Sequence, residues 1–237
     1  MGRKEETPPE KKDLDCAGQE SKSGCPGGPI ITISRDFSCG GGTVAKKLAA
    51  RLGWNFYDRA LLDRIVGQRR GEGGRFEDLG EDAPALLADQ SREIFESGYK
   101  GDKTYMRALV RALLDIAREG NAVLAGRGAN FLIHEGRRLA IRLAAPTDWR
   151  IARYARILET GMEEATDAVR REDERRRQYC LENIAGDVTD PLAYDLVINM
   201  RGIDTNTVQL LILNALRSRF DLKESALPLS DSGIRPL

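Results

Sequence analysis

Residues 30–52 read IITISRDFSCGGGTVAKKLAARL, and this stretch decides the fold of the chain. It begins with a β-branched run, Ile30–Ile33, which favours a short buried strand. It ends with apolar residues at every fourth position, Val44, Leu48 and Leu52, as on one face of an amphipathic helix. A glycine-rich turn joins the two. A strand, a glycine turn and a helix in this order predict a phosphate-binding loop.

The three glycines of the turn, Gly40, Gly41 and Gly42, leave their backbone N–H groups without side chains in the way. The first turn of the following helix directs its unpaired N–H groups and its positive dipole end into the same space. A Walker A loop reads GxxxxGK[ST], whereas here Gly41 and Gly42 stand where lysine and serine would be. Two interpretations follow: a phosphate loop without its lysine, or only a tight strand-to-helix turn.

The composition of the 237 residues is typical of a soluble globular protein, with 31% charged and 41% hydrophobic residues. Lys plus Arg equals Asp plus Glu at 37 each, so we expect neither nucleic acid nor a membrane as partner. The first residues lack the apolar core of a secretory signal. The four cysteines lack CxxC spacing, which argues against zinc or a disulfide framework. We therefore expect a cytoplasmic protein; the oligomeric state stays open.

The remaining pattern predicts an α/β sheet with helices on both faces. The expected strands are Ile30–Ser34, Trp54–Tyr57, Ala122–Ala125, Leu139–Leu143 and Tyr194–Asn199. The expected helices are Thr43–Leu52, Ala60–Val66, Pro84–Phe95, a helix capped by Thr104, Asn130–His134, Asp148–Leu158 with Thr147 as N-cap, Glu163–Ile184 loosened around Arg170–Arg177, and a last helix capped by Asp204 or Thr205. Residues 67–80 are expected to form a loop, 1–28 a disordered tail and 223–237 a C-terminal tail.

Charged and polar residues follow the predicted strands at their carboxyl ends, where open parallel sheets bind ligands. These residues are Arg35, Asp58, Arg127 between two glycines, and Asn199. A phosphate loop, an acid and two arginines at one edge predict a site for an anionic, hydrogen-bonding ligand such as a nucleotide. Arg35 opens the glycine turn, so its guanidinium could fold back over bound phosphates.

Five segments, in this order, resemble the cytidylate kinase-like family of P-loop nucleoside monophosphate kinases over roughly Pro29–Leu222. They are ITISRDFSCGGGTVAKKLAARLGWNFYD, AGRGANFLI, IRLAAPTDWRIARYARI, REDERRRQY and DPLAYDLVINMRGID. The resemblance implies a three-layer P-loop kinase fold with a five-stranded parallel sheet, a helical nucleoside monophosphate insert at about 60–101 and an arginine-bearing lid at about 159–187. It implies an ATP- and Mg²⁺-dependent phosphotransferase acting on CMP, dCMP or a similar small phosphorylated acceptor.

The resemblance also implies roles for matching residues. The loop that binds the ATP phosphate corresponds to Ser38, Cys39, Gly40, Gly41, Gly42 and Thr43, with Thr43 as a possible Mg²⁺-linked hydroxyl. Arg127 matches an arginine that clamps the acceptor phosphate, and Asp58 matches an acid that helps read the acceptor. In the lid, Asp173, Arg176 and Tyr179 match the family spacing, and Arg176 would neutralise the transferring phosphate. Arg171, Arg175 and Arg177 are lesser candidates.

The Walker lysine is absent at Gly41, as it often is in this branch of the family, and the chain departs from the family pattern at three other places. Ser38-Cys39 replaces a usual Gly-Ser, Gly42 replaces a common arginine, and Gly128 replaces an aspartate. A second hypothesis is therefore a nucleotide-binding sensor or regulatory module that has lost catalysis. A third is that the glycines form only a compact turn and bind no nucleotide.

Several candidate residues also have purely structural interpretations. Asp58 could cap the next helix, and most arginines of 171–177 could belong to a solvated helix face. We expect Lys46 and Lys47 to face solvent, Cys39 to fill a loop position, and Asp195 to make a structural hydrogen bond. His134, the only histidine, receives no catalytic role.

Overall fold

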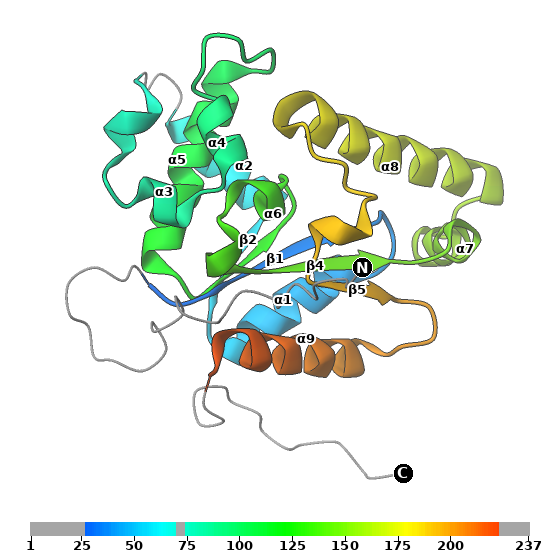
Figure 1. Cartoon of the computed structure of the whole chain (residues 1–237). Coiled ribbons are helices and arrows are strands. Elements are labelled where there is room, and N and C mark those ends of the chain that lie inside the picture. The colour runs from blue at the N-terminus through cyan, green and yellow to red at the C-terminus, as the bar shows by residue number, and fades with distance from the viewer. Residues whose placement is uncertain (1–26, 70–73, 223–237) are drawn as a thin grey trace, which may run out of the picture.

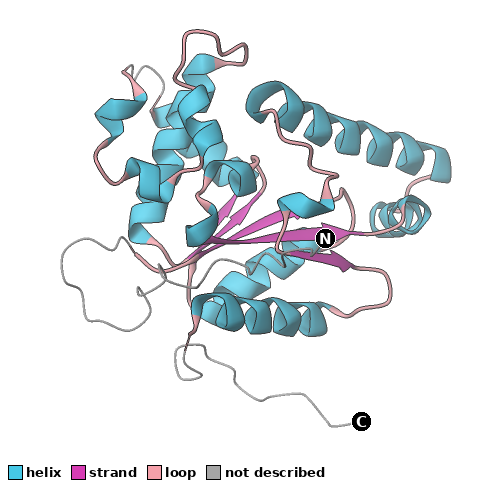
Figure 2. Ribbon diagram, in the orientation of Figure 1, coloured by secondary structure: helices cyan, strands magenta, loops and turns pink. Residues whose placement is uncertain are grey.

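The computed structural model of the chain describes residues 27–69 and 74–222. At its centre lies a five-stranded sheet in the order β2-β3-β1-β4-β5, and every neighbouring pair is parallel (Figures 1 and 2). The strands are β1 (Ile30–Arg35), β2 (Asn55–Asp58), β3 (Ala122–Ala125), β4 (Arg138–Ala144) and β5 (Leu196–Asn199). The predicted α/β class and the five-stranded parallel sheet are confirmed.

Helices cover both faces of the sheet. They are α1 (Gly41–Leu52), α2 (Arg59–Gln68), α3 (Ala83–Leu86), α4 (Asp89–Glu93), α5 (Lys103–Glu119), α6 (Ala129–Leu132), α7 (Thr147–Leu158), α8 (Met162–Ile184) and α9 (Thr205–Phe220), with 3₁₀ turns η1 (Phe76–Leu79), η2 (Glu135–Arg137) and η3 (Pro191–Ala193). In Figure 1, α1 and α9 lie below the sheet, while α2 to α6 lie above it. The long helix α8 also lies above the sheet, with α7 beside it.

Alternation along β1 separates two hydrophobic cores. Ile31 and Ile33 pack with apolar residues of α1 and α9 on one face, such as Leu48 and Leu216. On the other face Ile30 belongs to the larger core of α2, α5 and α6. Because one strand contributes to both cores, burial on its two faces sets the position of the glycine turn that follows it.

The predicted helix Pro84–Phe95 is wrong: two short helices, α3 and α4, replace it. The chain becomes extended at Leu87, which forms an antiparallel bridge with Ile133. Backbone bonds of 2.9 Å from Ala88 N to Leu132 O and 3.0 Å from His134 N to Leu86 O hold this pairing. Pairing with a distant segment therefore overrides local helix propensity. Within the predicted loop 67–80, η1 forms because it buries Phe76 and Leu79.

Three details of the predicted helix ends and of the lid differ from the structure. Asp102, not Thr104, caps α5, since its Oδ1 accepts from Tyr105 N at 3.0 Å. Thr147 is the first residue of α7 rather than its N-cap, and Thr147 Oγ1 accepts from Arg150. Helix α8 is continuous through 170–177, where Glu172 and Arg175 pair one turn apart at 2.6 Å. Asp204 is the cap of α9, one of the two predicted alternatives.

The described parts of the chain contain no helix that is long and apolar enough to cross a membrane. The predictions for most of residues 1–28, for 223–237 and for the centre of the loop 67–80 lie outside the described residues.

Candidate functional site

The glycine turn forms an open anion cradle at the N-terminus of α1. Gly40 precedes the helix with φ +89°, a left-handed conformation that favours glycine, and no side chain caps the first turn. A Cβ added at Gly42 would meet nothing within 4 Å, so the backbone there is accessible. The turn lines a cavity of about 270 Å³ together with Asp36, Phe37 and Arg153. Free helix N–H groups facing a cavity bind anions well.

Gly41, at the position of the Walker lysine, leaves little room for a side chain. A Cβ there would lie 3.0 Å from Arg35 Cβ, 3.1 Å from Leu143 Cδ1 and 3.3 Å from Cys39 Sγ. The first carbon of the Arg35 side chain therefore lies 3.0 Å from the point where a lysine side chain would begin. The crowding gives a physical reason for glycine at this position.

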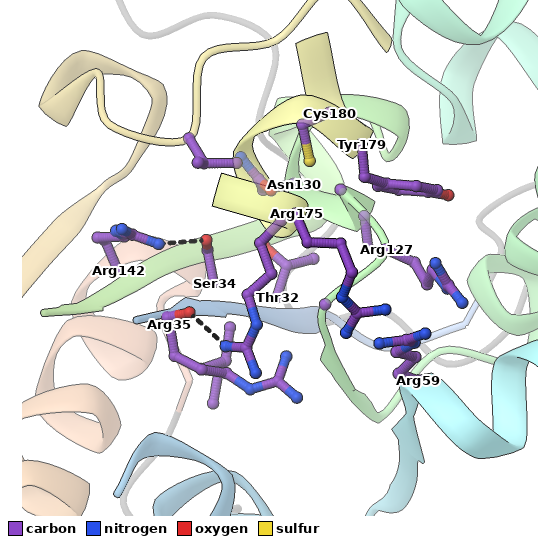
Figure 3. Close-up of a pocket in the computed structure, with 16 residues that line it drawn as sticks. Thr32, Ser34, Arg35, Arg59, Arg127, Asn130, Arg142, Arg175, Tyr179 and Cys180 are labelled. Atoms are coloured by element: carbon purple, nitrogen blue, oxygen red, sulfur yellow. Dashed lines mark hydrogen bonds between the residues drawn. The ribbon is translucent and has the colours of Figure 1, made fainter. Parts of the chain in front are cut away.

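A second cavity, of about 130 Å³, lies above the sheet between β1, β3 and α8 (Figure 3). Six of its lining residues are arginines, and none is a carboxylate: Arg35, Arg59, Arg127, Arg142, Arg175 and Arg176. Figure 3 shows Arg59, Arg127 and Arg175 on one side of this cavity and Arg142 on the opposite side. The cavity is therefore suited to an anion.

Arg35 and Arg176 line both cavities and join them. Arg176 Nη1 donates to the Arg35 carbonyl at 2.8 Å, and its guanidinium lies 5.3 Å from the Phe37 ring centre. Burial, followed by the neighbouring charge of Arg176, lowers the pKa of Arg35 to about 10. Among the described residues neither guanidinium forms an ion pair with a carboxylate. Two adjacent half-buried cations that form no ion pair within the described residues favour a bound anion between them.

Arg127 is held in place by three side chains of the helical region. Its Nε donates to Asp63 Oδ1 at 2.7 Å and its Nη2 to Asp63 Oδ2, and its guanidinium stacks on the rings of Tyr105 and Tyr179 at 5.5 and 4.9 Å. Burial alone would lower the pKa of Arg127, but the bonds to Asp63 raise it above the ordinary value. A bidentate pair also fixes the orientation of the guanidinium at the cavity wall.

Helix α8 is fastened to the glycine turn by Asp173. Its carboxylate accepts from Phe37 N at 2.9 Å and from Arg150 Nη1 at 2.5 Å. Arg150 is only 4% exposed and also donates to the carbonyls of Ala145 and Phe37. One buried cation thus connects the lid helix, the strand end of β4 and the phosphate turn.

The sequence profile of the cytidylate kinase-like family matches residues 30–201, most of the chain. The chain belongs to this family. It is 28% identical over 172 residues to a cytidylate kinase from Pyrococcus horikoshii, covering 72% of this chain and 79% of that protein. The family is thus one of nucleotide kinase-like proteins, and the fold is α/β with a five-stranded parallel sheet.

Solved structures resemble the chain in fold. An uncharacterized protein from Eubacterium ventriosum superposes with a TM-score of 0.62 at 21% identity, covering 80% of this chain and 98% of that one. A shikimate kinase from Bacteroides thetaiotaomicron gives a TM-score of 0.43 at 16% identity, covering 82% and 99%. At these identities the first likeness concerns the fold alone, and the second is too distant to support an argument.

The candidate residues of this cytidylate kinase-like chain divide into three groups. Arg35, Arg127, Arg176 and Tyr179 line the arginine cavity, and Ser38, Gly40, Gly41, Gly42 and Thr43 line the cavity at the turn. Asp173 lines neither cavity and bonds to Phe37 N in the turn. Asp58 lines neither cavity; its Oδ1 accepts from Leu61 N at 2.9 Å and caps α2.

The remaining assignments are structural. Cys39 is buried and its Sγ lies 3.5 Å from Leu143 O, and burial raises its thiol pKa, which argues against a reactive thiolate. Asp195 accepts from Ala140 N at 2.7 Å and pairs with Arg219, away from both cavities. Lys46 and Lys47 are exposed, as predicted.

The residues fit a bound phosphate better than a protein-held metal. The uncapped turn and the arginines match phosphate oxygens, whereas the described residues contain no group of three metal-ligating side chains. The Asp36 carboxylate beside the turn already accepts hydrogen bonds from Arg142 Nη2 and Ala145 N. Thr43, which is exposed at this cavity, is the hydroxyl that could meet a Mg²⁺ ion carried by a nucleotide.

Sequence reasoning missed several residues of the site: Thr32, Asp36, Asp63, Asn130, Arg142, Arg150 and Arg153. One of them had a usable signal in the sequence: Arg142 is a charged residue inside the otherwise apolar strand Leu139–Leu143. In the structure it stands opposite Ser34 in the parallel register of β4 and β1, and its Nη1 donates to Ser34 Oγ at 2.9 Å. Asp63 and Arg127 are separated by 64 residues, so their pairing depends on the tertiary fold.

Proposed function

We propose that this protein is an ATP-dependent phosphotransferase whose acceptor is a nucleoside monophosphate, with CMP and dCMP as first candidates, or a similar small phosphorylated molecule. Magnesium would accompany the nucleotide. Family membership supports the nucleotide kinase class, and the arrangement of the two cavities supports phosphoryl transfer between them.

The observation that carries the proposal is the position of Arg35 and Arg176. Both line the cavity at the glycine turn and the arginine cavity, and neither forms an ion pair with a carboxylate in the described chain. Phosphoryl transfer needs positive charge and alignment around the transferred group rather than covalent chemistry by the protein. The Arg35 side chain begins 3.0 Å from the point where the missing lysine would begin, so it is a natural substitute for that charge.

The other residues would bind and orient the two substrates. Backbone amides from Gly40 to Thr43 would hold the donor phosphates. Arg127, fixed by Asp63, would hold the acceptor phosphate through its remaining donors. Asp173 would keep α8 on the turn, so that Arg176 remains over the junction of the cavities.

A coupled assay of ADP release tests this proposal. The full chain is incubated with ATP and Mg²⁺ and each nucleoside monophosphate in turn. We expect acceptor-dependent ADP with at least one of them. The absence of ADP above background with every acceptor would contradict the proposal.

Arg176→Ala should lower turnover by about 10²–10³, the usual effect of removing one donor that stabilises the transferring group. Arg170→Ala is the matched control, because Arg170 is exposed on the same helix and lines neither cavity. Thermal unfolding should be nearly unchanged in both variants. Equal turnover in the two variants would exclude this role for Arg176.

A second candidate function, a nucleotide-binding sensor, is favoured by Gly41. A family member without room for the lysine can still bind phosphate through its backbone. Calorimetry with ATP and ADP separates the two: tight binding without turnover for any acceptor would support the sensor, and acceptor-dependent turnover would exclude it.

A further inference from the structure

The outer edge of the sheet at β5 is short and uncharged. Strand order places β5 at one end of the sheet, so that among the described strands only β4 pairs with it (Figure 1). None of its four residues, Leu196–Asn199, carries a charge, and Val197 is 46% exposed. An exposed strand edge offers N–H and C=O groups that pair readily with another strand unless charged side chains, proline or a covering segment prevent it. The β5 edge is therefore a candidate surface for strand pairing.

Other exposed apolar side chains adjoin this edge. Leu192, in η3 directly before β5, is 91% exposed, and Leu211 on α9 is 42% exposed. Leu211, Ala215 and Arg219 follow one another at every fourth position, so they form one ridge of α9. Arg219 pairs at 3.0 Å with Asp195, the residue before β5, and this places the ridge beside the strand. The apolar surface therefore extends from β5 onto the helix below it.

The charges at the two ends of β5 are opposite. The exposed Asp190 precedes the strand, and the exposed Arg201 follows it. Within residues 27–69 and 74–222 neither side chain forms an ion pair, and the Asp190 carboxylate accepts from Leu192 N at 2.9 Å. A second copy that runs antiparallel along β5 would bring Arg201 of each chain toward Asp190 of the other. The edge is thus complementary to itself in charge.

The alternation of side chains along β5 restricts the register of such a pair. Leu196 and Ile198 belong to the core below the sheet, whereas Val197 points to the opposite face. Directly opposite residues of an antiparallel pair share a face, so a two-fold axis between the copies must pass through a residue position. An axis at Val197 pairs Val197 with itself and Leu196 with Ile198. The central pairs are then all apolar.

We propose that β5 is the interface of a reversible homodimer, in which two copies pair antiparallel about Val197 and join their sheets. The occupant is a second copy of this chain because the edge complements itself in register and in charge. Two four-residue strands make a small interface, so contact between the α9 ridges contributes to it, and the dimer dissociates on dilution. Val197 and Arg201 line neither cavity, so the dimer is independent of the proposed activity.

Sedimentation equilibrium of the full chain over a range of concentrations tests the interface. We expect the mass of two chains at high concentration and of one chain on dilution. Val197→Lys places two like charges at the axis and should give a monomer throughout the range. The matched control is Leu181→Lys, since Leu181 is a similarly exposed apolar residue on α8. A wild type that is monomeric at every concentration, or equal dimerisation of the two lysine variants, would overturn the proposal.

Charge exchange between the two ends of β5 tests the direction of pairing. Arg201→Glu and Asp190→Arg should each weaken dimerisation by about tenfold, because attraction is replaced by repulsion at two symmetric places. The double variant restores opposite charges and should recover the dimer. A double variant that dimerises no better than either single variant would contradict the antiparallel arrangement.

Cross-linking tests the register, and it does so even if lysine at position 197 prevents folding. Directly opposite side chains have Cβ atoms about 4.5–5.5 Å apart, close to the span of a disulfide. In a chain with Cys16→Ser and Cys25→Ser, Val197→Cys should form a disulfide-linked dimer when oxidised glutathione is added. Leu192→Cys, more exposed but away from the axis, should not. Equal cross-linking of the two variants, or none at position 197, would overturn the proposal.

Discussion

Asp63 is the residue that orients the guanidinium of Arg127. Its carboxylate receives two bonds from the guanidinium and one of 2.7 Å from the Tyr105 hydroxyl. Burial raises the pKa of Asp63, but the bonds from Arg127 and Tyr105 outweigh it and hold the pKa below the ordinary value of 3.8. A carboxylate with a depressed pKa stabilises the folded state above its unfolded pKa and loses that effect as the pH falls through the folded value.

Asp63→Asn should therefore lower the melting temperature at pH 7, and the difference from wild type should shrink as the pH falls below about 3.8. Because a third of the Asp63 side chain is exposed, solvent screens the effect. Thermal unfolding between pH 7 and pH 3 measures it. Asp167→Asn, at an exposed position on α8, is the control. A difference in melting temperature that stays constant from pH 7 to pH 3 would show that the charge on Asp63 contributes nothing to the stability of the fold.

Gly41 and Gly42 are adjacent but should respond in opposite directions to a methyl group. Gly41→Ala should destabilise the fold by about 1–3 kcal/mol, since its Cβ would crowd Arg35 and Leu143. Gly42→Ala should stabilise it by about 0.4–1 kcal/mol, because the position is helical and open. Chemical denaturation of the two variants measures both changes in the free energy of unfolding. Changes of the same sign would contradict the expectation that Gly41 is crowded and Gly42 is not.

At the scale of elements, the lid helix α8 and the phosphate turn behave as one unit because Asp173 bonds to both the turn and Arg150. Arg150 is the more deeply buried partner, at 4% exposure. Removing the charge of Asp173 would leave this cation with carbonyl and hydroxyl partners and a single, longer ion pair of 3.9 Å to Asp36. The position of Arg176, one turn further along α8, would then be less restricted.

Asp173→Asn should reduce the free energy of unfolding by about 1–3 kcal/mol, the range for leaving a buried charged group less satisfied. Urea denaturation measures this. Glu174→Gln is the matched control, because Glu174 is exposed on the same helix. Equal losses in the two variants would mean that the Asp173 contacts do not fasten the lid.

At the scale of the whole molecule, the fold could be predicted from local patterns. The β-branched and apolar runs from Ile30 and from Ala122 predicted strands, and the apolar residues Val44, Leu48 and Leu52 at every fourth position predicted α1. Local patterns failed where contacts between distant parts of the chain determine the secondary structure or the partner of a side chain. The bridge of Leu87 to Ile133 splits a predicted helix, and the partner of Arg127 lies 64 residues away. Arg35 and Arg127 were predicted because they follow predicted strands at their carboxyl ends, and Arg127 also lies between two glycines. Nothing in the neighbouring sequence distinguishes Thr32 and Asn130 as site residues.

The central claim is that phosphate passes between the two cavities past Arg35 and Arg176. The most direct measurement follows labelled phosphate from [γ-³²P]ATP, with CMP, dCMP and the other nucleoside monophosphates as acceptors, and separates the products by chromatography. The account predicts label on an added acceptor with the wild-type chain and with Arg170→Ala, and little or none with Arg176→Ala. Label that remains in ATP, or appears only as inorganic phosphate whatever acceptor is present, would contradict it.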